Sequence, residues 1–381
     1  MQRLPRPGTS PLIAGVARSG LQAVRSELPP PGRARAYVAA FGAFLVTSTS
    51  AVSEVKSEPK ETPANLFVPV RAEMPGRQDS ADGFAKTPEL DALGRAPSPP
   101  VDYESWHGTS FGAFLSPKGD FWTDDGGIDV IVHFNAAMLA GRSWQTSHAN
   151  AVVVSAAFGA YGSGPYQEAM ADPGRFGRMI AEVVAGVSAQ KRHPGLHVRH
   201  VGIVAWSAGF GAVGRVLAVP KYFAQVDSVI LLDAMQAGYK DPSRGMGQGP
   251  DRVSLTGIDP YVRFAREAMT GKKQLVITHT SIVPPEYAST TDAALALVAA
   301  VAAPKHETSE SNSRGMVRSY RVDTGDLHVH GYRGQGPDDH MKHLHMVGDV
   351  VRDWLVPRWG APARAPGTSD RSTFAQSSPS P

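Results

Sequence analysis

Short runs of β-branched residues alternate with helix-like segments along much of this chain. Two of the runs, 128–134 and 151–156, are apolar at nearly every position, which is typical of parallel strands covered on both faces. In the segment that begins at Asp172-Pro173, apolar residues recur three and four positions apart, as they do in an amphipathic helix. Strands that alternate with helices predict an α/β fold, a doubly wound and mostly parallel sheet with helices on both faces.

Four further strands and four further helices complete this prediction, together with a short hairpin whose turn we expect at 117–119. The strands are expected at 198–205, 226–232, 273–280 and 316–322, and the helices at 208–217, 258–270, 290–302 and 339–355.

The composition of the ends differs from that of this body, which we place at 102–359. Residues 52–101 are rich in proline and charge, as linkers are, and residues 360–381 have the Ala/Pro/Ser composition of a disordered tail. In the N-terminal extension 1–51, two arginines precede an apolar stretch at 36–46, which is followed by a run of small residues that ends at Ala51. This pattern predicts a secretory signal segment, a secreted or cell-envelope protein and no stable membrane span after processing. A buried helix and an uncleaved anchor stay open as alternatives.

The charge balance excludes several classes of function. The chain has 38 basic and 35 acidic residues. Six arginines against one glutamate fall in residues 1–35, and three arginines against one aspartate fall in residues 358–381, so the basic excess lies at the two ends. No basic stripe with interleaved aromatics occurs in the body, and we expect no nucleic-acid partner. The absence of cysteine excludes thiolate catalysis, disulfides and cysteine-based zinc sites.

The segment around Ser207 gives the strongest indication of a catalytic residue. A predicted strand leads directly into the serine and a predicted helix leaves directly after it, with Ala205 and Gly209 as small neighbours. A sharp strand-to-helix turn requires such small residues, and the start of the helix directs backbone N–H groups at an oxyanion formed on the serine. This pattern resembles the nucleophile elbow of the α/β-hydrolase fold, with alanine in place of the usual first glycine.

The resemblance implies that a histidine and a carboxylate follow the serine in the chain. His340 lies where a glycine-rich loop meets the last predicted helix, and His343 and His345 lie further into that helix. Asp233 directly follows the strand 226–232, where its side chain points off the sheet edge at which ligands bind. We therefore expect Ser207, His340 and Asp233 to form a catalytic triad. Fallbacks for the acid are Glu286 and Asp292, although Ser289 three residues before Asp292 favours a helix cap.

The same resemblance implies an oxyanion hole and a pocket. One donor would be the backbone N–H of Ala208, and the second that of Asn135 or Ala136, after the strand 128–134. Substrate-binding candidates are Trp206, Tyr161 and Tyr166.

The expected reaction is hydrolysis of an ester, less favourably of an amide, in a small-molecule or polymer substrate, without cofactor or metal. The segment 236–257 is a candidate lid. The sequence does not indicate an oligomeric state.

Two other readings stay open. The C-terminal histidines are dense enough to suggest a zinc or iron site, although no established metal-hydrolase spacing occurs among them. They are His328, His330, His340, His343 and His345. The other reading is a non-catalytic envelope binding module on a hydrolase scaffold.

Overall fold

The computed structural model describes residues 100–159, 162–245, 247–284 and 287–360. The predicted signal-like segment, nearly all of the predicted linker and the tail from 361 onward lie outside the described residues. Within the described ranges, no helix combines the length and apolarity needed to cross a membrane.

The described residues form one ten-stranded sheet in the order β1-β2-β4-β3-β5-β6-β7-β10-β9-β8. Six neighbouring strands, from β4 to β10 in that order, run parallel, and antiparallel strands complete both edges. The strands are β1 (His107–Thr109), β2 (Gly112–Leu115), β3 (Gly127–Phe134), β4 (Val152–Ala156), β5 (His197–Trp206), β6 (Val226–Leu232), β7 (Gln274–His279), β8 (His306–Glu307), β9 (Arg318–Thr324) and β10 (Leu327–Tyr332).

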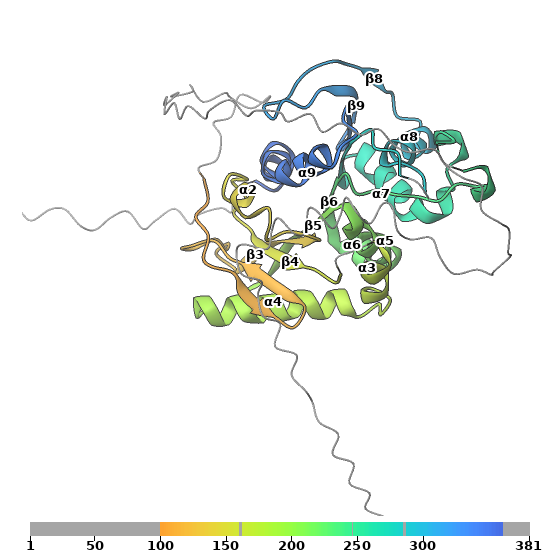
Figure 1. The fold of residues 1–381 in the computed structure, drawn as a ribbon. Coiled ribbons are helices and arrows are strands. Elements are labelled where there is room, and N and C mark those ends of the chain that lie inside the picture. The colour runs from red at the N-terminus through yellow and green to blue at the C-terminus, as the bar shows by residue number, and fades with distance from the viewer. Residues whose placement is uncertain (1–99, 160–161, 246, 285–286, 361–381) are drawn as a thin grey trace, which may run out of the picture. The chain divides into compact units, whose positions relative to one another are not determined.

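Helices cover both faces of this sheet (Figure 1). Side chains of β3 alternate between two buried apolar layers: Val130 and Val132 belong to one layer and Ile131 to the other, as the two-residue period of a strand requires. The fold class is therefore α/β, as predicted. The first layer packs against α3 (Gly164–Ala169), α4 (Arg175–Lys191), α5 (Phe210–Ala218), α6 (Pro220–Gln225), α7 (Asp259–Met269) and α8 (Thr290–Ala300), and the second against α2 (Gly141–Gln145), α9 (Pro337–His345), α10 (Val347–Val350) and α11 (Val356–Trp359).

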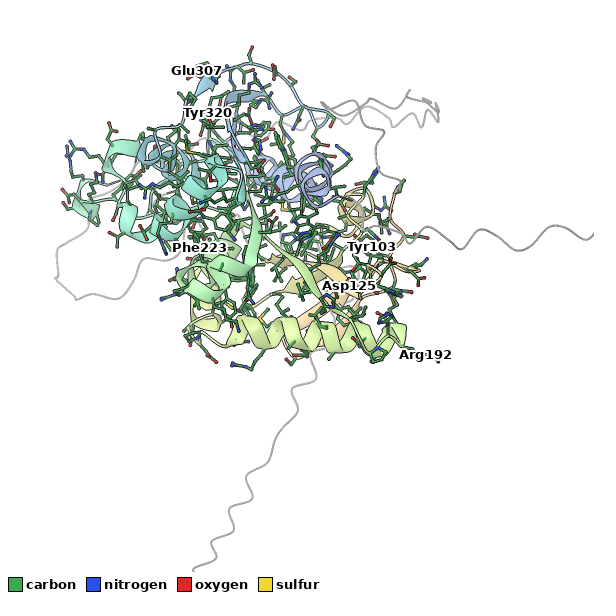
Figure 2. All side chains as sticks on the ribbon, turned by 180° about the vertical axis from the view of Figure 1, so that it is seen from behind. Tyr103, Asp125, Arg192, Phe223, Glu307 and Tyr320 are labelled. Atoms are coloured by element: carbon green, nitrogen blue, oxygen red, sulfur yellow. The ribbon has the colours of Figure 1, made fainter. Side chains whose placement is uncertain are left out.

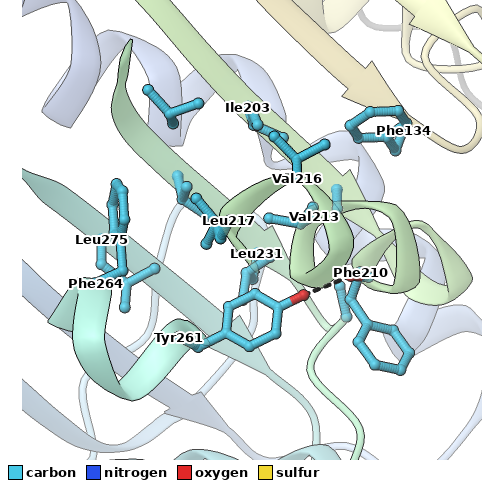
Figure 3. Close-up of a cluster of buried hydrophobic side chains, with 14 of the residues drawn as sticks. Phe134, Ile203, Phe210, Val213, Val216, Leu217, Leu231, Tyr261, Phe264 and Leu275 are labelled. Carbon is cyan, nitrogen blue, oxygen red and sulfur yellow. Dashed lines mark hydrogen bonds between the residues drawn. The ribbon is translucent and has the colours of Figure 1, made fainter. Parts of the chain in front are cut away.

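The core beneath α5 joins this helix to the sheet and to α7 (Figure 3). Val213 and Leu217 of α5 are fully buried, and the hydroxyl of Tyr261 on α7 donates to the carbonyl of Phe210 at the start of α5. Because α5 begins three residues after Ser207, this packing fixes the helix that follows the serine. Seen from behind, Figure 2 shows Tyr320 of β9 and Arg192, at the C-terminal end of α4, on distant parts of the fold.

Three details differ from the sequence prediction. The hairpin turns at Ser110 and Phe111, between β1 and β2, instead of at 117–119. The strand β10 was not predicted. The last helix begins at Pro337 instead of at 339 and continues as short segments, including a π-helical turn at Val351–Leu355.

Candidate functional site

Ser207 stands in a strained turn between β5 and α5. Its φ is 52°, in the left-handed region that non-glycine residues rarely adopt. A short 3-10 turn, η1 (Ser207–Gly209), leads into α5. A Cβ at Gly209 would lie 2.3 Å from the carbonyl oxygen of Phe134 at the end of β3. The turn can therefore pack against β3 because glycine occupies this position, as the small-residue pattern predicted.

Asp233 follows β6 at the same sheet edge, also with a positive φ, of 47°. Its buried carboxylate accepts hydrogen bonds from the backbone N–H and the hydroxyl of Thr280 (3.0 and 2.9 Å) and from the hydroxyl of Thr290 (2.7 Å). Burial raises the pKa of Asp233, but the hydrogen bond from His340 and the nearby imidazoles lower it, and the result lies well below the usual range. Asp233 is therefore held as a carboxylate.

His340 reaches this carboxylate from α9. Its Nδ1 lies 2.7 Å from Oδ2 of Asp233. Because an ionised carboxylate only accepts hydrogen bonds, Nδ1 carries the proton, and Nε2 of the neutral ring is then the basic nitrogen. His340 lies within the helix and not in the preceding loop, because α9 begins three residues earlier. Its place in the first turn of a helix restricts the ring more than a loop would.

Trp206 connects the serine's turn to His340. Its indole Nε1 donates to the backbone carbonyl of His340 (3.1 Å), and the two rings lie 4.6 Å apart at 30°. The residue that directly precedes Ser207 thus lies against the imidazole that binds Asp233. The structure brings these residues together from β5, β6 and α9, and it gives Trp206 a place against His340.

The loop after β3 holds the two other oxyanion candidates, Asn135 and Ala136, both with positive φ. The backbone N–H of Asn135 donates to the carbonyl of Ala156 (3.1 Å), and its side-chain amide donates to the carbonyl of Trp206 (3.1 Å). The Asn135 N–H is therefore occupied, which disfavours it as an oxyanion donor. The remaining donor candidates are the N–H of Ala136 and the N–H of Ala208, which belongs to the turn η1 that leads into α5.

Tyr166 does not lie where a pocket residue would. It is fully buried, its ring contacts Phe158 and its hydroxyl donates to the carbonyl of Gly159. Burial raises its pKa to about 12. Tyr166 supports the loop after β4 from within the core, contrary to the substrate-binding expectation, and Tyr161 lies outside the described residues.

The fallback acid Asp292 contacts groups other than His340. The carboxylate of Asp292 accepts the hydroxyl of Tyr239 (2.9 Å), and its backbone N–H donates to Ser289, which confirms the predicted helix cap. Glu286 lies outside the described residues.

The C-terminal histidines separate into different environments. His328 and His330 both contact Asp323 across the β9–β10 pair, at 2.8 and 3.1 Å. His343 is fully buried, its Nδ1 lies 2.8 Å from the hydroxyl of Thr278, and burial lowers its pKa to about 4. Among the described residues, no group of three or more acidic, histidine or cysteine side chains is placed to hold a metal ion.

Sequence reasoning missed the threonines that hold Asp233. Thr280 directly follows β7, and Thr290 is the first residue of α8. The position of Thr280 at a strand end was visible in the sequence, but the approach of α8 to β6 was not.

No known family model matches this chain, and no curated protein matches it. Among solved structures it is similar to the siderophore hydrolase EstB from Aspergillus nidulans, with 16% identity and a TM-score of 0.37 over 68% of this chain and 97% of that one. It is also similar to an uncharacterised protein from Capnocytophaga ochracea, with 13% identity and a TM-score of 0.34 over 65% and 64% of the two chains.

Proposed function

We propose that this protein is a serine hydrolase that cleaves an ester through an acyl-enzyme intermediate. Ser207 is the nucleophile, His340 the general base and then the general acid, and Asp233 the carboxylate that orients His340. The observation that carries the proposal is the 2.7 Å contact between His340 and Asp233, made beside the strained turn that presents Ser207.

Each step follows from a group already described. Nε2 of His340 takes the hydroxyl proton as Ser207 attacks the carbonyl carbon of the ester. The tetrahedral oxyanion accepts hydrogen bonds from the backbone N–H groups of Ala208 and Ala136. Collapse expels the alcohol, which takes the proton from His340, and water repeats the sequence to release the acid.

The surroundings of His340 suit a base that holds its proton briefly. Asp233 stabilises the imidazolium without taking its proton, because hydrogen bonds and nearby imidazoles keep the pKa of this carboxyl low. The face of Trp206 fixes the ring plane. Esters are favoured over amides because their alkoxide leaving group needs less protonation.

A test combines labelling with turnover. We expect a fluorophosphonate to label the purified chain on Ser207 in a one-to-one ratio. We also expect Ser207→Ala to lower kcat for p-nitrophenyl acetate by about 10⁴-fold or more, since a triad acts as a unit. Equal turnover by Ser207→Ala would refute the proposal.

Membership of the α/β-hydrolase superfamily is part of the same proposal. It is supported by the chain order serine, aspartate, histidine and by the positions of these residues after β5, after β6 and in α9. A secreted or envelope location is proposed from the signal-like segment alone. Detection of a chain shortened at Ala51 in the culture medium of an expressing host would test it.

A further inference from the structure

Large exposed apolar side chains are concentrated at one edge of the molecule. Among the described residues they are Met138, Leu139, Leu255 and Val283, which are 42, 55, 40 and 57% exposed. Met138, Leu139 and Val283 lie four or five residues after the carboxyl ends of β3 and β7, and Leu255 lies in the connection from β6 to α7. These connections leave the sheet at the edge that holds Ser207 and Asp233. Single exposed apolar residues need no explanation, but their confinement to the ligand-binding edge of an α/β sheet does.

Two of these residues belong to the loop that carries the proposed oxyanion donor. Residues 136–140 read Ala-Ala-Met-Leu-Ala, a segment without a polar side chain in which Ala137 and Ala140 are buried and Met138 and Leu139 are exposed. The N–H of Leu139 donates to the carbonyl of Ala136 (3.0 Å), so Leu139 lies one turn beyond the donor. Asn135, just before it, binds the carbonyl of Trp206, which places this loop against the serine's turn.

Val283 belongs to a second apolar loop. Residues 282–284 read Ile-Val-Pro, and Thr280, just before them, donates two hydrogen bonds to Asp233. In the sheet, β3 lies on one side of β5 and β6, and β7 lies on the other. The two apolar loops therefore flank the strands that carry the proposed nucleophile and acid.

We propose that Met138, Leu139 and Val283 form an apolar rim that binds the acyl chain of the substrate, which makes this enzyme a hydrolase of esters with apolar acyl groups. The inference rests on the proposed function. The acyl side is favoured because the oxyanion donors bind the acyl carbonyl, and Leu139 lies one turn from Ala136. A chain of several methylene groups that starts at this carbonyl meets the rim next.

The experiment measures how kcat/KM depends on acyl length. Substrates are p-nitrophenyl acetate, butyrate, hexanoate and octanoate, each kept below its micelle concentration so that the alcohol and the physical state stay constant. The variants replace apolar atoms by polar ones of similar shape: Met138→Gln with Leu139→Asn, and Val283→Thr. The matched control is Met138→Leu with Leu139→Met, which keeps the rim apolar.

For the wild type we expect kcat/KM to rise about twofold per methylene, roughly half of the factor for complete burial of a CH₂ group. The double polar variant should lose about tenfold on octanoate and less than twofold on acetate, and Val283→Thr about threefold on octanoate. The apolar control should retain the wild-type ratio. Because the side chains are exposed, these variants should fold, and an unchanged Tm checks this.

An octanoate-to-acetate ratio that is the same in the wild type and in the polar variants would overturn the rim. A loss seen only with vesicle-bound substrate would also overturn it, because the patch would then bind a lipid surface. Activity that persists in Ser207→Ala would instead overturn the proposed function and would leave the length ratio measurable, so the two failures are distinguishable.

Discussion

Asp233 and Asp323 are two of the described carboxylates that contact histidine, and they do so in different ways. Asp233 binds His340, which is 107 positions away along the chain, and three threonine-derived donors hold the carboxylate in a buried pocket. Asp323 binds His328 and His330, five and seven positions away, across an antiparallel strand pair. Its side chain is 30% exposed. The first cluster requires the whole fold, whereas the second requires one hairpin.

The backbone shows the same difference. Four of the described non-glycine residues with positive φ are Asn135, Ala136, Ser207 and Asp233, at the ends of β3, β5 and β6. No non-glycine residue between 318 and 332 has a positive φ. Such conformations cost about 1–3 kcal/mol each and persist where the surrounding structure enforces them. Strain combined with contacts between distant segments identifies the candidate site better than histidine density does.

Substitution of the two carboxylates tests the comparison between these clusters most directly and should give the largest effect. Asp233→Asn should lower kcat on p-nitrophenyl acetate by about 10⁴-fold, because the amide favours the wrong tautomer of His340. Asp323→Asn should leave kcat within about twofold, since its cluster contacts none of the proposed catalytic groups. Steady-state kinetics on both variants measures this, and equal losses would show that the two clusters act together.

The close backbone packing at Gly209, next to Ser207, provides a second test of the comparison between the two clusters. Gly209→Ala would bring a methyl group against the carbonyl of Phe134 and should cost about 3 kcal/mol of unfolding free energy, as overpacking does. Gly214, five residues on in α5, has no atom closer than 3.4 Å to an added Cβ. Gly214→Ala should therefore be neutral or stabilising by up to about 1 kcal/mol. Urea denaturation compares the two, and a tolerated Gly209→Ala would contradict the close approach.

His343, one turn after His340, tests whether water is excluded from the surroundings of Asp233. Burial lowers its pKa to about 4, whereas an unfolded histidine titrates near 6.5. Between these values the unfolded chain binds more protons, so stability rises with pH across this window and is constant above it. At pH 5 the wild type should have lost about 2 kcal/mol through this group.

His343→Asn should remove that loss, measured as the difference in unfolding free energy between pH 8 and pH 5. His107→Asn, at an exposed strand position, is the control and should keep the wild-type difference. An unchanged pH dependence in His343→Asn would mean that His343 is hydrated in the folded protein.

The fold was largely predictable because its strands and helices have strong local patterns. Strands such as β3 and β4 are apolar at most positions and buried throughout, as parallel strands covered on both faces are. The strand β10 was missed because His328, Gly331 and their neighbours lack a β-branched pattern. Its burial depends on β7 and β9, which no local pattern contains.

The site was predictable where function imposes a local sequence and not where it depends on packing. The elbow was readable because Gly209 is required by a close backbone approach. Tyr166 was misplaced because an aromatic residue near a glycine-rich loop looks the same whether it faces solvent or the core. The occupied N–H of Asn135 depends on the register of β3 against β4, which the sequence does not display.

Substitution of a threonine that holds Asp233 is the last test of the comparison and should give the smallest effect. Thr290→Val removes one hydroxyl donor from Oδ1 and leaves the backbone N–H of Thr280 on that oxygen. With weaker support the carboxylate should orient His340 less well, and we expect kcat to fall about tenfold, equivalent to about 1.4 kcal/mol, with little change in KM. Thr290→Ser keeps the donor and should recover most of kcat, which a merely space-filling threonine would not require. If valine and serine behave alike, packing by α8, and not its hydroxyl, positions the acid.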